Sequence, residues 1–365
     1  MKNVFKYSKI SKEDDENIEM KLKDFIAGRY PFMEFVSSRK SYSVRRFDFK
    51  IKDADLCTDK MLRELASKIE IVLDTDKVSV SRTGAMAIIN VPRKKKDTLY
   101  LGEGLNEFIA SPKCPVRCYF GERDDGFPAE INFADTPHVL IGGQSGAGKT
   151  VLLSDIILSM CYKYSPDEIG LYLIDHKKEL EMFKVLPHVK MTAFTNSELQ
   201  IIADHLRGEL EYRIGLMSSE YTNIEEYNKR HKNKLSYNFL IFDEADFVLQ
   251  HSSSLGPTAD TMRLFVKDLA SMARSVGIYV IIASQKPSKA NIDTTIKSNL
   301  SARIALRVGS LMDSRMIIEG RGAELLNGKG DGLMKGLDTL VRFQSAYTEL
   351  DERKKAIKEI VKEYR

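Results

Sequence analysis

The sequence has no hydrophobic run of the roughly 18 residues that a membrane-spanning helix requires. Its opening residues, Met-Lys-Asn-Val-Phe-Lys-Tyr-Ser-Lys, also lack the long apolar core of a secretory signal peptide. We therefore expect a cytoplasmic protein with no direct membrane span.

Cysteine is scarce, with four residues in a chain of 365. So few cysteines make a poor disulfide framework for a chain of this length. Cys114 and Cys118 stand as Cys-Pro-Val-Arg-Cys, but no second Cys or His pair lies nearby in the sequence to complete a zinc site. We expect reduced cysteines in a strand rather than a metal centre.

The chain also has little net charge, +4 at pH 7, so its overall electrostatics do not indicate nucleic acid as a partner. A ring-shaped motor could still concentrate basic residues on an inner surface, which composition does not reveal. The hydrophobic fraction of 43% and the charged fraction of 30% are those of an ordinary globular protein. The length predicts two or three domains.

The chain does contain a glycine-rich segment, residues 142–150, directly after an apolar run. Its Gly-x4-Gly-Lys-Thr spacing is that of a phosphate-binding loop (P-loop). Glycines allow φ > 0 and leave room for backbone N–H groups to wrap a polyphosphate. Lys149 would reach the β- and γ-phosphates of ATP, and Thr150 would hold Mg²⁺ through its hydroxyl. The predicted nucleotide-binding residues are Gly143, Gln144, Ser145, Gly146, Ala147, Gly148, Lys149 and Thr150.

The flanks of this loop predict a buried strand before it and a helix over residues 151–160 after it. Downstream, short apolar segments alternate with helical stretches, which indicates a parallel sheet with helices on its faces. The motifs follow the C-terminal ends of the strands, where ligands bind in such sheets. The predicted strands are residues 139–141, 170–174, 238–242, 279–283 and 303–308.

Two of these strands end in side chains suited to ATP hydrolysis. Asp243 would hold Mg²⁺ through water, and Glu244 would orient the water that attacks the γ-phosphate. Gln285, at the end of the next strand, could sense the γ-phosphate and pass that state to the following loop. An arginine from a neighbouring subunit could stabilise the transition state. The candidates, which spacing alone does not separate, are Arg274, Arg303 and Arg315.

The hydrophobic pattern predicts three regions along the chain. Residues 1–40 form an N-terminal helical extension, and residues 41–110 form a small α/β domain. Residues 111–365 form the motor domain. That domain ends in an amphipathic helix over residues 351–365, whose apolar side chains need a surface to pack on.

Taken in order, these motifs resemble those of the FtsK/SpoIIIE DNA-translocase motors, within the wider HerA/FtsK group. The resemblance covers roughly residues 41–348. The segments that carry it are the P-loop with Thr136-Pro-His-Val before it, Leu173-Ile-Asp175-His-Lys177, Glu209-Leu-Glu-Tyr-Arg213, Asp243-Glu244-Ala-Asp246, Ala273-Arg274-Ser-Val-Gly-Ile, Ala283-Ser-Gln285-Lys-Pro287, Ala302-Arg303-Ile-Ala and Asp313-Ser-Arg315.

The resemblance implies an α/β fold in which a RecA-like P-loop ATPase domain with a mostly parallel sheet follows the small α/β domain. It also implies a homo-oligomeric ring, expected to be a hexamer, that binds ATP at subunit interfaces and moves along double-stranded DNA. Arg274 then becomes the favoured arginine to act on a neighbouring subunit's nucleotide. The residues expected to contact DNA phosphates rather than bases are Lys286, Lys289 and Lys297.

We expect no counterpart here of the N-terminal spans, linker and C-terminal winged-helix domain of the family's long septal members. We therefore expect a translocase of a mobile element, plasmid or phage that moves DNA for transfer, replication or packaging, with a recruiting protein as partner. One alternative is a type VII secretion-like ATPase acting on protein substrates, since those motors share the motifs. Another is a nucleotide switch or assembly scaffold, against which the intact Lys149, Asp243 and Glu244 argue.

Overall fold

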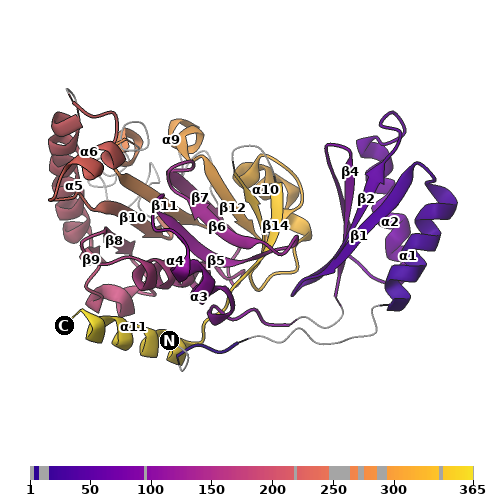
Figure 1. Cartoon of the computed structure of the whole chain (residues 1–365), viewed down its shortest axis with the longest axis horizontal. Helices are drawn as coiled ribbons and strands as arrows, with labels where there is room; N and C mark the ends of the chain where they lie inside the picture. The colour runs from indigo at the N-terminus through magenta and orange to yellow at the C-terminus, as the bar shows by residue number, and fades with distance from the viewer. Residues whose placement is uncertain are drawn as a thin grey trace.

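The computed structural model describes residues 4–7, 16–93, 97–217, 220–245, 264–269, 275–285, 294–336 and 340–364. These residues form two sheets, one four-stranded and one ten-stranded. Figure 1 shows them as two units side by side, the smaller in indigo and purple. Within these ranges, no helix is long and apolar enough to cross a membrane.

The small unit packs two helices against an antiparallel sheet of order β1-β2-β4-β3. Apolar residues at helical spacing bury one face of each helix, so Leu22 and Ile26 of α1 and Leu65 and Ile69 of α2 are fully buried. The elements are α1 (Glu16–Arg29), β1 (Met33–Lys40), β2 (Val44–Ile51), α2 (Asp59–Leu73), β3 (Ser79–Thr83) and β4 (Met86–Pro92).

The first domain boundary expected from the sequence falls inside a hairpin. β1 pairs antiparallel with β2, with Lys40 opposite Arg45, so residue 40 lies at the turn between two paired strands. Paired strands that share a buried face belong to one domain. We propose that the small unit comprises residues 16–92 and that α3 (Gly102–Ala110) belongs to the large unit, because its apolar face lies in the core of that unit.

The large unit is built on a ten-stranded sheet of order β6-β5-β14-β13-β12-β7-β11-β10-β8-β9. The strands from β12 to β9 run parallel, and the others are antiparallel. All five predicted strands are present, within two residues of the predicted bounds, as β7, β8, β10, β11 and β12. The strands are β5 (Arg117–Arg123), β6 (Pro128–Asn132), β7 (His138–Gly142), β8 (Ile169–Asp175), β9 (Val189–Ala193), β10 (Tyr237–Asp243), β11 (Ile278–Ser284), β12 (Ala302–Leu306), β13 (Asp331–Lys335) and β14 (Leu340–Ser345).

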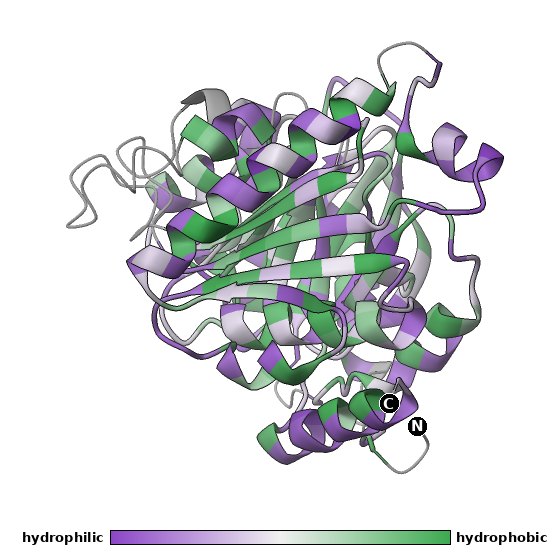
Figure 2. Cartoon of the chain, turned by 90° about the vertical axis from the view of Figure 1, so that its left-hand side faces the viewer, coloured by the Kyte–Doolittle hydropathy of each residue, from purple (hydrophilic) through white to green (hydrophobic). Residues whose placement is uncertain are grey.

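Helices cover both faces of this sheet (Figure 2). Because side chains alternate along a strand, Val139 and Ile141 of β7 pack in the layer with α3, α4 and α11, whereas Leu140 packs in the layer with α5. Ile357 and Ile360 of α11 lie in the first layer, so the predicted C-terminal helix has a surface to pack on. The remaining elements are α4 (Lys149–Lys163), η1 (Glu181–Val185), α5 (Asn196–Met217), α6 (Ile224–Arg230), α9 (Thr294–Asn299), α10 (Leu311–Ile318), η2 (Ala323–Leu325) and α11 (Leu350–Glu363).

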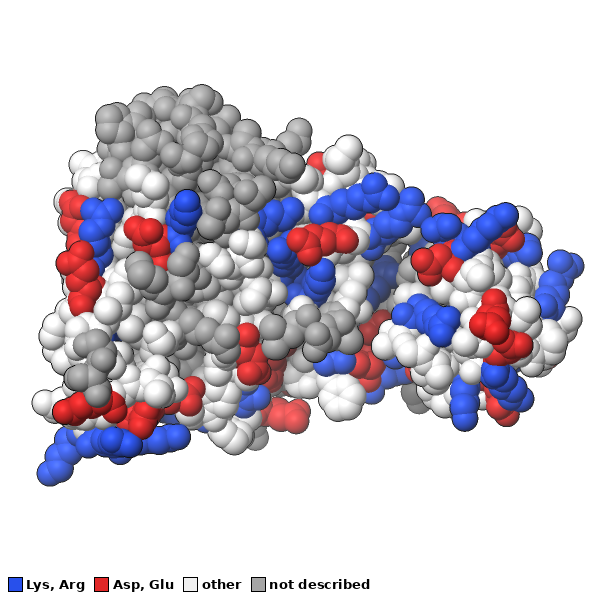
Figure 3. Space-filling view, turned by 90° about the horizontal axis from the view of Figure 1, so that it is seen from above, with Lys and Arg blue, Asp and Glu red and all other residues white. Residues whose placement is uncertain are grey.

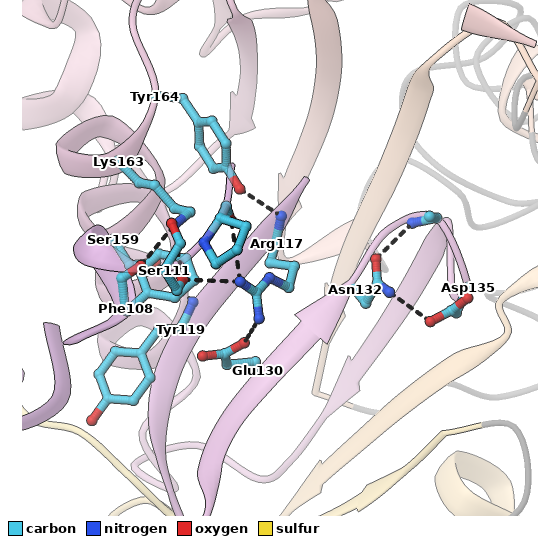
Figure 4. A network of polar contacts seen from close by, with 12 residues as sticks. Phe108, Ser111, Arg117, Tyr119, Glu130, Asn132, Asp135, Ser159, Lys163 and Tyr164 are labelled. Atoms are coloured by element: carbon cyan, nitrogen blue, oxygen red, sulfur yellow. Dashed lines mark hydrogen bonds and ion pairs between the residues drawn. The ribbon is translucent and has the colours of Figure 1, made fainter. Parts of the chain in front are cut away.

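A polar network fastens the ends of α3 and α4 to the edge of the sheet (Figure 4). The Arg117 guanidinium of β5 contacts Glu130 and the Ser111 hydroxyl, each at 2.9 Å. The Lys163 ammonium of α4 donates to the Phe108 and Ser111 carbonyls at 2.6 and 2.7 Å, which satisfies the last carbonyls of α3. The helix that begins at the P-loop is therefore held at both of its ends.

Polar contacts also join the two units. Arg46 of β2 and Asn90 of β4 both contact the Asp124 carboxylate, at 3.0 and 3.1 Å. Arg342 of β14 forms an ion pair with the fully buried Asp331 at 2.7 Å and donates a hydrogen bond to β3 of the small unit at 3.3 Å. The contact between the units thus depends on paired charges.

The four cysteines are free thiols. Cys118 is buried in β5, as expected for a cysteine in a strand, whereas Cys114 is exposed before that strand.

Candidate functional site

The segment between β7 and α4 has a backbone that requires glycine. Gly146 and Gly148 adopt φ values of 75° and 110°, which other residues rarely take. A Cβ at Gly143 would lie 2.9 Å from the Leu306 side chain, and one at Gly148 would lie 3.3 Å from the Gly330 backbone. The loop leads into the N-terminus of α4, where the helix dipole and free N–H groups favour an anion.

Lys149 is the first residue of α4 and is 6% exposed. Its ammonium group donates a hydrogen bond to the Gly143 carbonyl at 2.7 Å. The side chain therefore folds back along the loop and holds a positive charge beside the backbone that would surround a phosphate.

Thr150 and Asp243 lie together although they belong to separate motifs. Thr150 Oγ1 lies 3.2 Å from Asp243 Oδ2. Asp243 is 3% exposed, and within the described part of the chain its second oxygen, Oδ1, has no hydrogen-bond partner. Burial, together with the negative charges of Asp175 and Glu179, raises the pKa of Asp243 to about 6.

These features fit a divalent cation that arrives with a nucleotide. A buried carboxylate oxygen without a hydrogen-bond donor needs a compensating charge. The described residues contain no group of three or more His, Cys, Asp or Glu side chains that could hold a metal ion by themselves. Mg²⁺ commonly takes one or two protein ligands and fills its shell with water and substrate phosphates. Thr150 and Asp243 suit that mode of binding.

Glu244 directly follows β10 with a φ of 58°, a left-handed conformation that is uncommon for glutamate. Its Oε1 accepts a hydrogen bond from Gln285 Nε2 and pairs with Lys177 Nζ, the latter at 3.0 Å. Burial opposes the negative charge of this carboxylate, but the contacts from Gln285 and Lys177 outweigh it and hold the pKa of Glu244 below its ordinary value. The carboxylate is therefore ionised near neutral pH and can accept a proton.

Two side chains without a role in the sequence motifs reach the site from the segment after β8. Lys177 contacts Glu244, and Glu179 Oε2 accepts a hydrogen bond from Thr150 Oγ1 at 2.6 Å. β8 pairs in parallel with β10, so the C-terminal ends of both strands meet at one edge of the sheet. The position of Lys177 and Glu179 in the sequence could have indicated a place in the site, because both follow the C-terminal end of a predicted parallel strand.

Arg303, a candidate for an arginine that acts on a neighbouring subunit, makes its contacts within its own chain. It is 7% exposed, and its guanidinium pairs with Glu319 at 2.7 Å. The same group donates to the carbonyls of Lys297 and Leu300 at 3.1 and 3.3 Å. These internal contacts favour a structural role for Arg303 over action on another subunit.

The structure places two of the other predicted basic residues. Arg315 is exposed on α10, and Lys297 is partly exposed on α9. The predicted residues that lie outside the described ranges are Arg274, Lys286, Lys289 and Asp246.

Comparisons with known proteins agree with this geometry. The model of the FtsK/SpoIIIE family matches residues 113–337. The DNA translocase FtsK of Campylobacter jejuni subsp. jejuni is 33% identical over 270 residues, which cover 71% of this chain and 28% of that protein. The chain belongs to the FtsK/SpoIIIE family. The FtsK of Borreliella burgdorferi is 32% identical over 349 residues, covering 91% of this chain and 41% of that protein. The chain thus spans less than half of these relatives.

Solved structures show the same fold. The cytoplasmic domain of the Thermomonospora curvata type VII secretion ATPase EccC is 27% identical, with a TM-score of 0.57 over 68% of this chain and 30% of that chain. The pCW3 conjugation coupling protein TcpA has a TM-score of 0.67 and 19% identity, over 96% of this chain and 100% of that chain. The RecA-like P-loop ATPase fold expected for an FtsK/SpoIIIE member is confirmed.

Proposed function

We propose that the chain is the motor of an ATP-driven translocase that moves double-stranded DNA. Membership of the FtsK/SpoIIIE family, whose relatives above carry the name DNA translocase, supports this function. The observation that carries it is the meeting of Lys149, Thr150, Asp243 and Glu244 at one edge of the parallel sheet. These side chains supply what phosphoryl transfer to water needs: phosphate binding, a metal site and a base.

The roles of the residues follow from their contacts. The P-loop backbone and Lys149 bind the phosphates of ATP, and Thr150 and Asp243 hold Mg²⁺. Bound Mg²⁺ would neutralise charge on the phosphates. Glu244 accepts the proton of the attacking water, with its carboxylate held by Gln285.

We propose that subunits form a homo-hexameric ring with ATP at their interfaces. Arg274 is the proposed arginine that acts across an interface, with Arg315 as the exposed alternative. Lys286, Lys289 and Lys297 are proposed to contact DNA phosphates. On the face drawn in Figure 3, basic side chains gather near the junction of the two units, with acidic ones among them. The setting in transfer, replication or packaging of a mobile element, plasmid or phage, with a recruiting protein, stays a prediction.

Steady-state ATP hydrolysis tests the function directly. Rates are measured without nucleic acid, with single-stranded DNA and with long linear duplex, at moderate and raised salt, with Lys149→Ala as the control for contaminating ATPases. We expect stimulation by duplex that fades as salt rises, because contacts to phosphates release counterions. ATP hydrolysis that does not respond to any DNA, in a sample shown to be oligomeric, would reject DNA translocation.

A second candidate, a protein-secretion ATPase, has one observation in its favour. The type VII secretion ATPase EccC is 27% identical to this chain, over 68% of the length of this chain. Stimulation of hydrolysis by a helical export peptide, with no response to duplex DNA, is the result that would favour it over the translocase.

A further inference from the structure

The segment from Asp175 to Leu180, here called the 175–180 loop, is anchored at both of its ends beside the P-loop. Asp175 is fully buried at the end of β8, opposite Asp243 of β10 in the sheet. Its two carboxylate oxygens accept hydrogen bonds from the backbone N–H groups of Lys177 at 2.9 Å and Leu180 at 2.7 Å. Leu180 is fully buried as well. The intervening residues are therefore presented to the nucleotide site at a defined position.

Glu179 on this loop contacts the hydroxyl that the P-loop motif assigns to Mg²⁺. Thr150 Oγ1 lies 2.6 Å from Glu179 Oε2 and 3.2 Å from Asp243 Oδ2. A threonine hydroxyl has one proton to donate and two lone pairs that can bind a cation. When a carboxylate accepts the proton, the lone pairs are left to face the metal.

The second oxygen of Asp243 supports a cation at this point independently of Glu179. Asp243 is 3% exposed, and no hydrogen-bond donor in the described ranges contacts its Oδ1. The Asp243 and Glu179 carboxylates thus both meet the Thr150 hydroxyl.

We propose that Glu179 is a positioning residue for the magnesium site. It accepts the Thr150 proton, which directs the lone pairs of that hydroxyl toward the metal, and it adds a negative charge that attracts the cation. Partners of metal ligands commonly change metal affinity by about 10- to 100-fold when they are removed. This inference rests on the proposed binding of Mg²⁺ and ATP but not on DNA translocation.

Glu179 can be substituted with little structural cost. It is exposed, and within the described residues the one hydrogen bond of its carboxylate is to Thr150. Glu179→Ala removes both the acceptor and the charge, whereas Glu179→Gln keeps an acceptor oxygen and removes only the charge. Glu181→Gln is the matched control, because Glu181 begins η1 two residues later and pairs with Lys184 at 2.8 Å.

The test measures equilibrium binding of a fluorescent ATP analogue, first in a Mg²⁺ titration and then in EDTA. Thermal unfolding of each ligand-free variant checks that it is folded. We expect Glu179→Ala to raise the Mg²⁺ concentration at half-saturation by about tenfold or more, with a smaller shift for Glu179→Gln and none for Glu181→Gln. Binding in EDTA should be unchanged, since Glu179 then has no cation to position.

Two outcomes would overturn the inference. One is a Glu179→Ala variant with the wild-type Mg²⁺ titration. The other is an equal loss of binding with Mg²⁺ and with EDTA, which would indicate a merely structural role. Failure of the wild-type chain to bind the analogue under any condition would instead reject the proposed ATP site, so the two proposals fail separately.

Discussion

Glu244 shows how much a single carboxylate depends on its neighbours. Its left-handed backbone turns the side chain toward Gln285 and Lys177, and those two contacts keep it ionised despite burial. The roles proposed for Lys149 in phosphate binding and for Glu244 in proton transfer should therefore be separable.

We predict that Lys149→Ala abolishes nucleotide binding, while Glu244→Gln binds ATP and traps it. The amide of glutamine cannot accept the proton of the attacking water, so turnover should fall by about 10²-fold or more. Equilibrium binding and single-turnover hydrolysis distinguish the two defects. A Glu244→Gln chain that hydrolyses ATP at the normal rate would remove Glu244 from the mechanism.

A second prediction concerns pH. The proposed base Glu244 would act in its ionised form, and its lowered pKa preserves that form as the pH falls. Lys177→Met removes one of the contacts that lower this pKa, so the pKa of Glu244 should rise and the acid limb of the kcat–pH profile should move to higher pH. Lys184→Met, a lysine paired only with Glu181 on η1 in the described contacts, is the control. An acid limb that stays in place in Lys177→Met would show that this contact does not tune the base.

Among the elements, α11 determines how well the P-loop helix is supported. It packs with α4 in one apolar layer, and Thr348 just before it donates a hydrogen bond to the buried Asp155 of α4 at 2.6 Å. The amphipathic pattern of the sequence predicts this helix, but only the fold shows that its partner is α4.

We predict that Ile360→Ala lowers the free energy of unfolding by about 2–5 kcal/mol, because it leaves a cavity where a fully buried side chain packed. Urea denaturation measures the change, and Lys358→Ala on the exposed face of the same helix is the control. If Ile360→Ala lowers the free energy of unfolding no more than Lys358→Ala does, α11 is not part of the cooperative core.

At the scale of the whole molecule, the proposed ring needs one subunit to complete the site of the next. Because Arg303 is held by contacts within its own chain, we favour Arg274 and Arg315 as the candidates to act in trans.

We predict that Arg274→Ala subunits assemble but hydrolyse ATP about 10³-fold more slowly, as expected for loss of a trans-acting arginine. Mixing them with Lys149→Ala subunits should restore part of the activity, because a mixed interface combines an intact P-loop with an intact Arg274. Hydrolysis rates and size-exclusion chromatography of the mixtures provide the measurement. If ATP hydrolysis is restored by mixing Lys149→Ala subunits with Arg315→Ala subunits, and not with Arg274→Ala subunits, Arg315 is the arginine that acts across the interface.

The local features of this protein can be predicted from its sequence. Glycine and lysine spacing at residues 143–150 specifies a phosphate loop, and apolar runs of strand length specify β7, β8, β10, β11 and β12, because backbone conformation and side-chain alternation are short-range properties. The family resemblance rests on the same local motifs.

Which side chains meet depends on the fold. Lys177 and Glu179 lie beside the P-loop because β8 pairs with β10, and the Arg303 guanidinium contacts the carbonyls of Lys297 and Ile317. Residue 40 lies in a hairpin because β1 pairs with β2. Strand order and pairing bring residues together across long stretches of chain, and this information is absent from the spacing within any one motif.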